Sequence, residues 1–324
     1  MHKRIVVLRA GGLGDVLLTV PALYVLRDRF PHQGIEAIGY EQSWAAVGAL
    51  VDEVTSIDLP LFAPLFTGAH SSDLERWFER VDLLVSWTSR VPQVPLTPVI
   101  HDSPYPPPGV HAAAWLVRSL GEEIERPHLS DALVQVSPDE RARGRQILDN
   151  LAVGRPVVVH PGAGAGWKRW SLEGFAHVAD SLSRDGHSVV LAEGPADAEI
   201  TAAVRSLARS NLPTLRVGST RILAAILAES SAFVGNDSGV THLAAMAGVP
   251  TVALFGPSDP ASWAPLGSVH VLRACTARAH VQGQIRVCHD PHCMEHIQVA
   301  DVLLALKTQD THVLQDSIGS LSGT

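Results

Sequence analysis

Several loops of this sequence follow apolar segments and carry side chains suited to phosphate or sugar chemistry. The most informative stretch is FVGNDSGVTHLAAMAGVPTVALFGPSDPASWAP, residues 233–265. It reads as a strand, a polar turn, a helix that opens near Ser238, a second strand and a Gly-Pro-rich loop. The first turn of a helix leaves backbone N–H groups unpaired and carries partial positive charge, which suits an anion such as a diphosphate. Simple helix capping by Asp237 or Ser238 is the alternative, because both residue types are common caps.

A second loop, AGGLGD at residues 10–15, lies between the first apolar segment and a predicted helix. Its glycines allow a ligand to approach the backbone, and Asp15 places a carboxylate at the helix start. The spacing differs from the G-x-G-x-x-G of dinucleotide-binding proteins. An ordinary cap is the alternative role for Asp15.

Two further loops complete the set. HPGAGAGWKRW, residues 160–170, presents Lys168, one of only three lysines in the chain. It lacks the GK[ST] ending of a P-loop, so we predict a glycine turn whose lysine neutralises a diphosphate. A solvated Lys168–Arg169 pair is the alternative. EGPADAE, residues 193–199, offers carboxylates to ribose hydroxyls. No D-x-D pair occurs, so a metal-bridged nucleotide-sugar site is not predicted.

Cysteines and nearby histidines raise the question of zinc. The three cysteines are Cys275, Cys288 and Cys293, an odd number that argues against a disulfide framework. The segment CHDPHCMEHI adds His289, His292 and His296. Its C-x4-C spacing differs from the C-x2-C of common zinc knuckles, so a structural loop is favoured over a metal site.

Composition sets outer limits. With 324 residues, 46 % hydrophobic and 18 % charged, the chain fits two globular domains. The net charge is −8, and residues 41–110 hold nine acidic residues and three arginines, a net charge of −6. Nucleic acid is therefore not an expected partner. There is no apolar run of the ~18 residues needed to span a membrane and no signal peptide, so a cytoplasmic location is expected.

Short apolar segments alternate with amphipathic ones, which is typical of parallel α/β layers. Predicted strands are 4–8, 35–39, 81–86, 98–101, 157–160, 188–192, 215–217 and 231–234. Predicted helices are 15–30, 43–50, 72–80, 110–120, 137–151, 172–184, 197–209, 220–229 and 299–307. The break at residues 152–156 marks the predicted domain boundary. Two parallel-sheet halves imply a cleft between them.

Four motifs occur in a fixed order across residues 1–297. They are GGLGDVLLTVPAL, HPGAG with Lys168-Arg169-Trp170, GNDSGVTHLAAMAGVPTVALFGPSDPASWAP, and a late Cys-Met-x-x-Ile. Together they resemble glycosyltransferase family 9, the bacterial heptosyltransferases. The resemblance implies a GT-B architecture of two Rossmann-like parallel-sheet domains facing a central cleft. We expect an acceptor-binding domain at 1–152, a nucleotide-sugar-binding domain at 153–298, and a C-terminal helix with a frayed tail at 299–324.

The resemblance also implies roles for individual residues. Asp15 matches the family's catalytic aspartate, and Lys168 matches its diphosphate-binding lysine, which we place with Asp15 in the catalytic pair. Asp197 stands where the family often has a glutamate that holds the ribose, and its side chain is one carbon shorter. The full set of expected donor-binding residues is Gly12, Gly14, His160, Gly162, Gly164, Lys168, Asp197, Asp237, Ser238, Gly239, Thr241 and His242.

The predicted function is the inverting, metal-independent transfer of a heptose-type sugar from a nucleotide-sugar donor to a hydroxyl of a glycoside. The resemblance implies that the donor is ADP-heptose. No cofactor beyond this donor is expected. Because residues 41–110 are acidic, we expect a small neutral or cationic soluble acceptor, such as an aminoglycoside-type compound. A lipopolysaccharide core heptosyltransferase is the alternative, and contact with a membrane surface is expected only for such a lipid-linked acceptor. A sugar-nucleotide epimerase and a non-catalytic sugar-nucleotide-binding protein are alternatives of another class.

Overall fold

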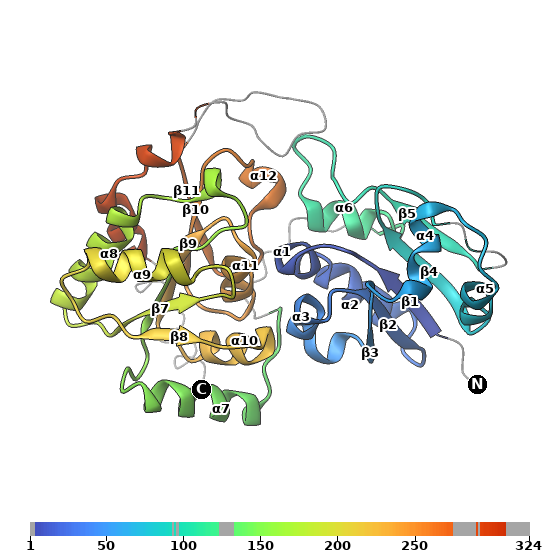
Figure 1. Cartoon of the computed structure of the whole chain (residues 1–324), viewed down its shortest axis with the longest axis horizontal. Coiled ribbons are helices and arrows are strands. Elements are labelled where there is room, and N and C mark those ends of the chain that lie inside the picture. Colours follow the sequence, from blue (N-terminus) through green and yellow to red (C-terminus); the bar gives the residue numbers. More distant parts are fainter. Residues whose placement is uncertain are drawn as a thin grey trace, which may run out of the picture. The chain divides into compact units, whose positions relative to one another are not determined.

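The computed structural model describes residues 4–92, 94, 97–122, 133–274, 290 and 292–308. The chain divides into two compact units, Met1–Pro127 and His128–Thr324. Each unit is built on one parallel β-sheet with helices packed along it (Figure 1). The predicted α/β class with two parallel sheets is therefore confirmed.

The first unit contains a five-stranded sheet of order β3-β2-β1-β4-β5, in which every strand pair is parallel. The strands are β1 (Arg4–Leu8), β2 (Gly34–Gly39), β3 (Glu53–Ser56), β4 (Val81–Trp87) and β5 (Val99–Asp102). The central strand β1 is fully buried from Ile5 to Leu8. This burial on both faces explains why β1 reads as a continuous apolar run in the sequence.

The helices of the first unit are α1 (Leu13–Leu17), α2 (Val20–Arg29), α3 (Glu41–Trp44), α4 (Pro64–Thr67), α5 (Ser72–Phe78) and α6 (Ala112–Arg118). Two 3-10 turns, η1 (Ala45–Leu50) and η2 (Pro60–Phe62), complete the list. The single helix expected over 15–30 is broken between α1 and α2. Pro21 has no N–H to donate to the carbonyl of Leu17, so the first helix ends before it.

The second unit contains a six-stranded parallel sheet of order β11-β10-β9-β6-β7-β8. The strands are β6 (Val157–His160), β7 (Val189–Glu193), β8 (Thr214–Arg216), β9 (Ala232–Asn236), β10 (Thr251–Phe255) and β11 (Val269–Arg273). The short edge strands β3 and β11 were not predicted. Each pairs on one side only and is partly exposed, so neither shows the apolar run of a central strand.

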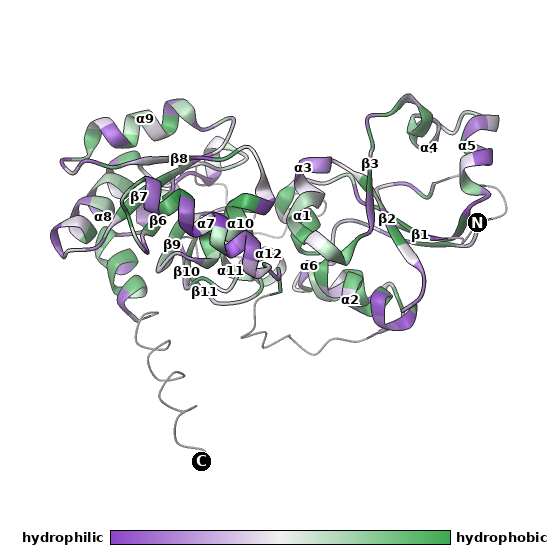
Figure 2. Ribbon diagram, turned by 90° about the horizontal axis from the view of Figure 1, so that it is seen from below, coloured by the Kyte–Doolittle hydropathy of each residue, from purple (hydrophilic) through white to green (hydrophobic). Residues whose placement is uncertain are grey.

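The helices of the second unit are α7 (Pro138–Asn150), α8 (Leu172–Arg184), α9 (Ala198–Leu207), α10 (Thr220–Ala228), α11 (Gly239–Met246) and α12 (Pro260–Trp263). The 3-10 turns η3 (Gly166–Lys168) and η4 (Cys293–His296) and a helix over residues 299–308 accompany them. Figure 2 shows hydrophilic residues gathered on helices such as α5 and α7, whereas a buried central strand such as β1 is hydrophobic.

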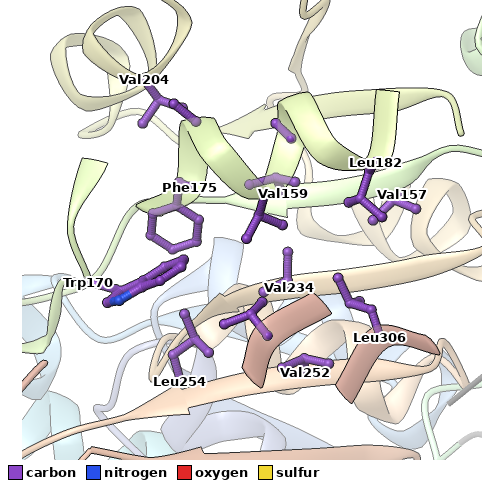
Figure 3. Close-up of a cluster of buried hydrophobic side chains, with 14 of the residues drawn as sticks. Val157, Val159, Trp170, Phe175, Leu182, Val204, Val234, Val252, Leu254 and Leu306 are labelled. Carbon is purple, nitrogen blue, oxygen red and sulfur yellow. The ribbon is translucent and has the colours of Figure 1, made fainter. Parts of the chain in front are cut away.

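A hydrophobic cluster holds α8 and the 299–308 helix against the second sheet (Figure 3). Trp170 and Phe175 meet edge to face with ring centroids 5.1 Å apart. The Trp170 indole N–H also donates to the carbonyl of Ile297 at 3.0 Å. The end of the glycine-rich loop 160–170 is thereby anchored in the core.

Helix α7 belongs to the second compact unit, whereas the sequence analysis expects the domain boundary at residue 152. Its Arg141 and Arg145 both bind Glu229 at the end of α10, at 3.2 and 2.7 Å. A Cβ atom added to Gly144 of α7 would lie 2.7 Å from the backbone of Ala225, which shows how closely the two helices approach. The break at 152–156 separates α7 from β6 within one unit.

Each sheet contains one point at which the chain reverses its direction of strand addition. In the first unit β2 lies on one side of β1 and β4 on the other, and in the second unit β7 and β9 flank β6 in the same way. The loops after such a pair of strands diverge and leave a crevice at their carboxyl ends, which is where open α/β sheets bind ligands. The loops after β1 and β4, and those after β6 and β9, are therefore the candidate sites.

Candidate active site

The crevice of the second unit brings Lys168 and Asp237 together. Lys168 follows β6 and Asp237 follows β9, and the Lys168 Nζ donates to Asp237 Oδ2 at 2.6 Å. Asp237 is 6 % exposed and also accepts a hydrogen bond from the hydroxyl of buried Ser258. Two loops 69 residues apart in sequence are thus joined by one buried carboxylate.

Helix α11 starts directly beyond this pair. Ser238 is its N-cap and accepts from the Thr241 N–H at 3.4 Å, so the capping role considered for Ser238 is confirmed. Within the described part of the chain, no hydrogen bond is formed by the N–H groups of Gly239 and Val240. Both residues are partly exposed. Capping and anion binding are therefore compatible, because the cap uses one N–H and leaves two.

Asp197 forms a second cluster, with His160 and Gly194. Its Oδ2 accepts from the Gly194 N–H at 3.1 Å and lies 3.2 Å from His160 Nε2. Hydrogen bonding to His160, against the effect of burial, holds the pKa of Asp197 below its ordinary value, with further help from Gly194 and Arg169. The carboxylate is therefore ionised and acts as an acceptor, as hydroxyl donors such as those of a ribose require.

Glycine is required next to this carboxylate. A Cβ atom at Gly162 would lie 2.3 Å from Asp197 Oδ1, and one at Gly194 would lie 2.7 Å from Oδ2. His160 is 3 % exposed, and its Nδ1 lies 3.4 Å from the Ser238 hydroxyl. The imidazole therefore connects the Asp197 cluster with the start of α11.

Asn236 holds the glycine loop in place. Its amide nitrogen donates to the carbonyls of Pro161 and Gly162 at 2.9 and 3.3 Å, and its Oδ1 accepts from the Trp170 N–H at 2.9 Å. The sequence analysis did not single out Asn236 or Ser258. The signal available was that Asn236 is a polar residue at the end of the apolar strand β9 and that Ser258 lies in the loop after the apolar strand β10.

The late Cys-Met-x-x-Ile motif supports the site from behind. Cys293 and Met294 are buried, and a Cβ atom at Gly256 would lie 2.2 Å from the Met294 sulfur. Across the residues that the structure describes, no group of three or more His, Cys, Asp or Glu residues is placed to hold a metal ion. Cys275, Cys288 and His289 lie outside the described residues. The motif therefore contributes to the hydrophobic packing of the second unit.

In the first unit, Asp15 is held by Arg9. The Arg9 Nη2 donates to Asp15 Oδ1 at 2.9 Å, and the Gly12 N–H donates to Oδ2 at 3.1 Å. Asp15 is the third residue of α1 and Gly12 is its N-cap, so this carboxylate satisfies a free N–H of the helix start. The Asp15 side chain is 41 % exposed, whereas that of Arg9 is 4 % exposed.

These residues open onto a pocket of about 360 Å³ within the first unit. It lies at the reversal point of the first sheet, since its walls come from the loops after β1 and β4 together with Phe66, Pro104 and Tyr105. The lining residues are Arg9, Ala10, Gly11, Asp15, Phe66, Trp87, Thr88, Ser89, Arg90, Pro104 and Tyr105. Its walls combine aromatic rings, two arginines and one carboxylate, which are groups that bind saccharides.

The remaining predicted site residues fall in different places. Gly12 and Gly14 lie beside Asp15 in the first unit, and the other predicted donor-binding residues belong to the second unit. Gly164 is exposed, with nothing within 4 Å of an added Cβ. His242 is buried on α11, and the Thr241 hydroxyl donates to the Asn236 carbonyl at 2.5 Å. Thr241 therefore acts within the turn itself.

None of the helices among the described residues is both long enough and apolar enough to cross a membrane.

The aromatic and basic groups that line the pocket were not predicted from the sequence. Arg9 offered a signal, because a charged residue at the end of a buried apolar strand is unusual. Trp87, Arg90 and Tyr105 offered none, since their proximity to Asp15 depends on the strand order.

Comparisons with known proteins agree with the motif order. The model of "Glycosyltransferase family 9 (heptosyltransferase)" matches residues 86–286, more than half of the chain. The chain is 26 % identical over 287 residues to lipopolysaccharide heptosyltransferase 3 of Escherichia coli, covering 78 % of this chain and 83 % of that protein.

Two solved structures share the fold. The family 9 glycosyl transferase of Veillonella parvula DSM 2008 has a TM-score of 0.74 at 22 % identity, covering 96 % of this chain and 97 % of the other. The ADP-heptose lps heptosyltransferase II of E. coli has a TM-score of 0.73 at 20 % identity, covering 97 % and 99 %. The two parallel-sheet units are thus of the GT-B architecture. The chain belongs to glycosyltransferase family 9, the heptosyltransferase family.

Proposed function

We propose that this glycosyltransferase transfers a heptose from a nucleoside-diphosphate-heptose donor to a hydroxyl of a saccharide, with inversion at the anomeric carbon. The names of its relatives favour ADP-heptose as this donor. The acceptor oxygen forms a bond to that carbon, and the bond to the diphosphate oxygen breaks. Asp15 takes the proton of the acceptor hydroxyl as general base. The observation that carries the proposal is the Lys168–Asp237 pair at the open N–H groups of α11.

The second unit is proposed to bind the leaving group. The N–H groups of Gly239 and Val240 point to an anion site at the helix start, and Lys168 adds a cation next to it. Donors fixed in advance where negative charge develops stabilise the transition state more than the ground state. Asp197, held ionised by His160, is proposed to accept hydrogen bonds from the ribose.

Metal independence is part of the proposal, because Lys168 and the start of α11 supply the positive charge that a bound cation supplies in other enzymes. The measurement is the transfer rate after dialysis against EDTA, compared with the rate after adding back Mg²⁺ or Fe²⁺. An unchanged rate is expected. A rate that collapses with EDTA and returns with one cation contradicts metal independence and leaves the transfer itself in place.

The acceptor is proposed to bind in the pocket beside Asp15. Among the described residues that line it, Asp15 is the single carboxylate, and none of the nine acidic residues of 41–110 takes part. Several of those acids are paired elsewhere, for example Glu53 with Arg4 and Asp52 with Arg27. The acidity of 41–110 therefore does not describe this pocket, which weakens the expectation of a cationic acceptor. A saccharide of the lipopolysaccharide core type, as the relatives' names indicate, is favoured.

The deciding experiment incubates the purified protein with ADP-heptose and a panel of acceptors. The panel includes core saccharides with and without lipid, neutral glycosides and aminoglycosides. Transfer to a core saccharide by the wild type, and its loss in Asp15→Ala with ADP binding retained, is the expected result. Retained turnover in Asp15→Ala removes Asp15 as the base. An epimer formed from the donor alone indicates an epimerase, and ADP binding without turnover on any acceptor indicates a binding protein.

A further inference from the structure

We propose that Arg9 is the positioning residue of the reaction, which fixes the Asp15 carboxylate in place for proton transfer. The inference rests on the proposed function and adds a residue that the motifs do not contain. It starts from one feature of the first unit, which is a buried arginine whose charge is balanced by a partly exposed aspartate at the pocket.

Arg9 is a costly residue for the fold. Burial lowers the pKa of its guanidinium, against the opposing effect of the Asp15 charge. Its buried Nε has no hydrogen-bond partner among the described residues. A buried donor left unsatisfied destabilises the folded state, and ion pairs of this kind are weak evidence for stability. Side chains that break the ordinary rules of burial in this way concentrate at functional sites.

The backbone of Arg9 is tightly held, so its guanidinium is a fixed point. Its N–H donates to the Ile38 carbonyl at 3.1 Å, and its carbonyl accepts from the Trp44 indole N–H at 3.3 Å. At the tip, Nη1 donates to the Trp87 carbonyl at 3.4 Å. Arg9 therefore links the ends of β2 and β4 to Asp15.

The carboxylate is fixed through both of its oxygens. Arg9 binds Oδ1, and the Gly12 N–H binds Oδ2. A carboxylate has about four lone-pair sites, so each oxygen keeps capacity to accept the acceptor's hydroxyl proton. Fixing the base in this way avoids the loss of rate that follows when a reacting group is misplaced.

The test compares Arg9→Met, Arg9→Lys and Arg9→Gln with Arg27→Met. Arg27 lies in the same unit, pairs with Asp52 at 3.0 Å and does not line the pocket, so its variant controls for loss of an arginine ion pair. Each variant is measured for kcat, acceptor and donor KM, ADP binding by calorimetry and thermal unfolding. We expect Arg9→Met to lose kcat by about 10²-fold, the scale of a misplaced catalytic group, with ADP binding unchanged.

The lysine and glutamine variants separate charge from structure. Arg9→Lys keeps a cation and is expected to retain a higher kcat than Arg9→Gln, even if Arg9→Met does not fold. A kcat for Arg9→Met equal to that of Arg27→Met overturns the inference, as does equal loss in the lysine and glutamine variants. These outcomes differ from failure of the proposed function, in which the wild type shows no transfer or Asp15→Ala remains active.

Discussion

Gly162→Ala tests whether Asp197 is held in place by its neighbours. The added methyl would lie 2.3 Å from Asp197 Oδ1 and 2.5 Å from its Cγ. The backbone of Gly162 is not left-handed, so alanine brings no backbone strain. The substitution therefore acts through this one side-chain clash, and Asp197 must move away from His160 and Gly194.

The magnitude follows from the two hydrogen bonds that Asp197 loses. Each hydrogen bond to a charged group contributes about 1.5–3 kcal/mol, and part of this returns when water replaces the lost partners. Replacing glycine by alanine stabilises by about 0.4–1 kcal/mol through the unfolded chain. A net loss of about 2 kcal/mol is expected, which lowers Tm by about 4–8 °C in a domain of this size.

The matched control is Gly164→Ala, two residues along the same loop. An added Cβ there has nothing within 4 Å, so this variant is expected to melt at or slightly above the wild-type temperature. The assays are differential scanning calorimetry and calorimetric titration with ADP. Gly162→Ala is expected to bind ADP more weakly and Gly164→Ala to bind it normally. Equal Tm and equal ADP affinity in the two variants would show that Asp197 is free to move, and would refute the reasoning.

Three further predictions concern the second unit. Lys168→Met removes a cation beside α11 and leaves Asp237 buried without its ion pair, so ADP affinity and kcat are both expected to fall, as measured by titration and steady-state kinetics; retention of both would remove Lys168 from the donor site. Hydrogen bonding to Arg221 lowers the pKa of Glu140 from 4.5 to about 2, so its contribution to stability is complete above pH 4.5 and is lost as pH falls toward 2. Acid titration of Tm should therefore be shallower over that range in Glu140→Gln than in the wild type, and parallel curves would contradict this assignment. Gly144→Ala forces a methyl to 2.7 Å from the Ala225 backbone, and overpacking of this kind costs about 1–3 kcal/mol, against about 1 kcal/mol of gained helix propensity. A lower urea midpoint of unfolding is therefore expected for Gly144→Ala. An unchanged midpoint would show that α7 and α10 can move apart without loss of stability.

Much of the secondary structure was readable because buried parallel strands are continuous apolar runs. The strands β1 and β6 and the helix α8 have the bounds predicted for them. Two features were not predicted because they depend on contacts between distant parts of the chain. The edge strands β3 and β11 lack an apolar run, so the sequence pattern does not indicate them. Helix α7 packs on α10 through ion pairs with Glu229, which lies more than eighty positions away in the sequence.

The motifs themselves were also readable, because each places glycines and polar residues between a strand and a helix. Asp15, Lys168 and Asp237 were singled out in this way, and Asp197 was singled out by the resemblance to the family. The structure brings Lys168 to Asp237 and Asp197 to His160. Gly12 and Gly14 lie beside Asp15 in the first unit, and Gly164 is exposed. A glycine in a loop indicates that another group can approach the backbone closely. Only the folded structure shows which group this is, and whether one is there at all.

The sequence by itself determined the α/β class, the family motifs and the residue types available for chemistry, because these depend on local pattern. Tertiary structure alone decided which loops meet, since strand order places the ends of β1 and β4 together in one sheet and of β6 and β9 in the other. It also revealed the burial of Arg9 against Asp15 and the absence of the acidic residues of 41–110 from the described pocket lining. Charge summed along a chain does not predict the charge of a pocket, because folding selects a few side chains from distant segments and pairs the others elsewhere.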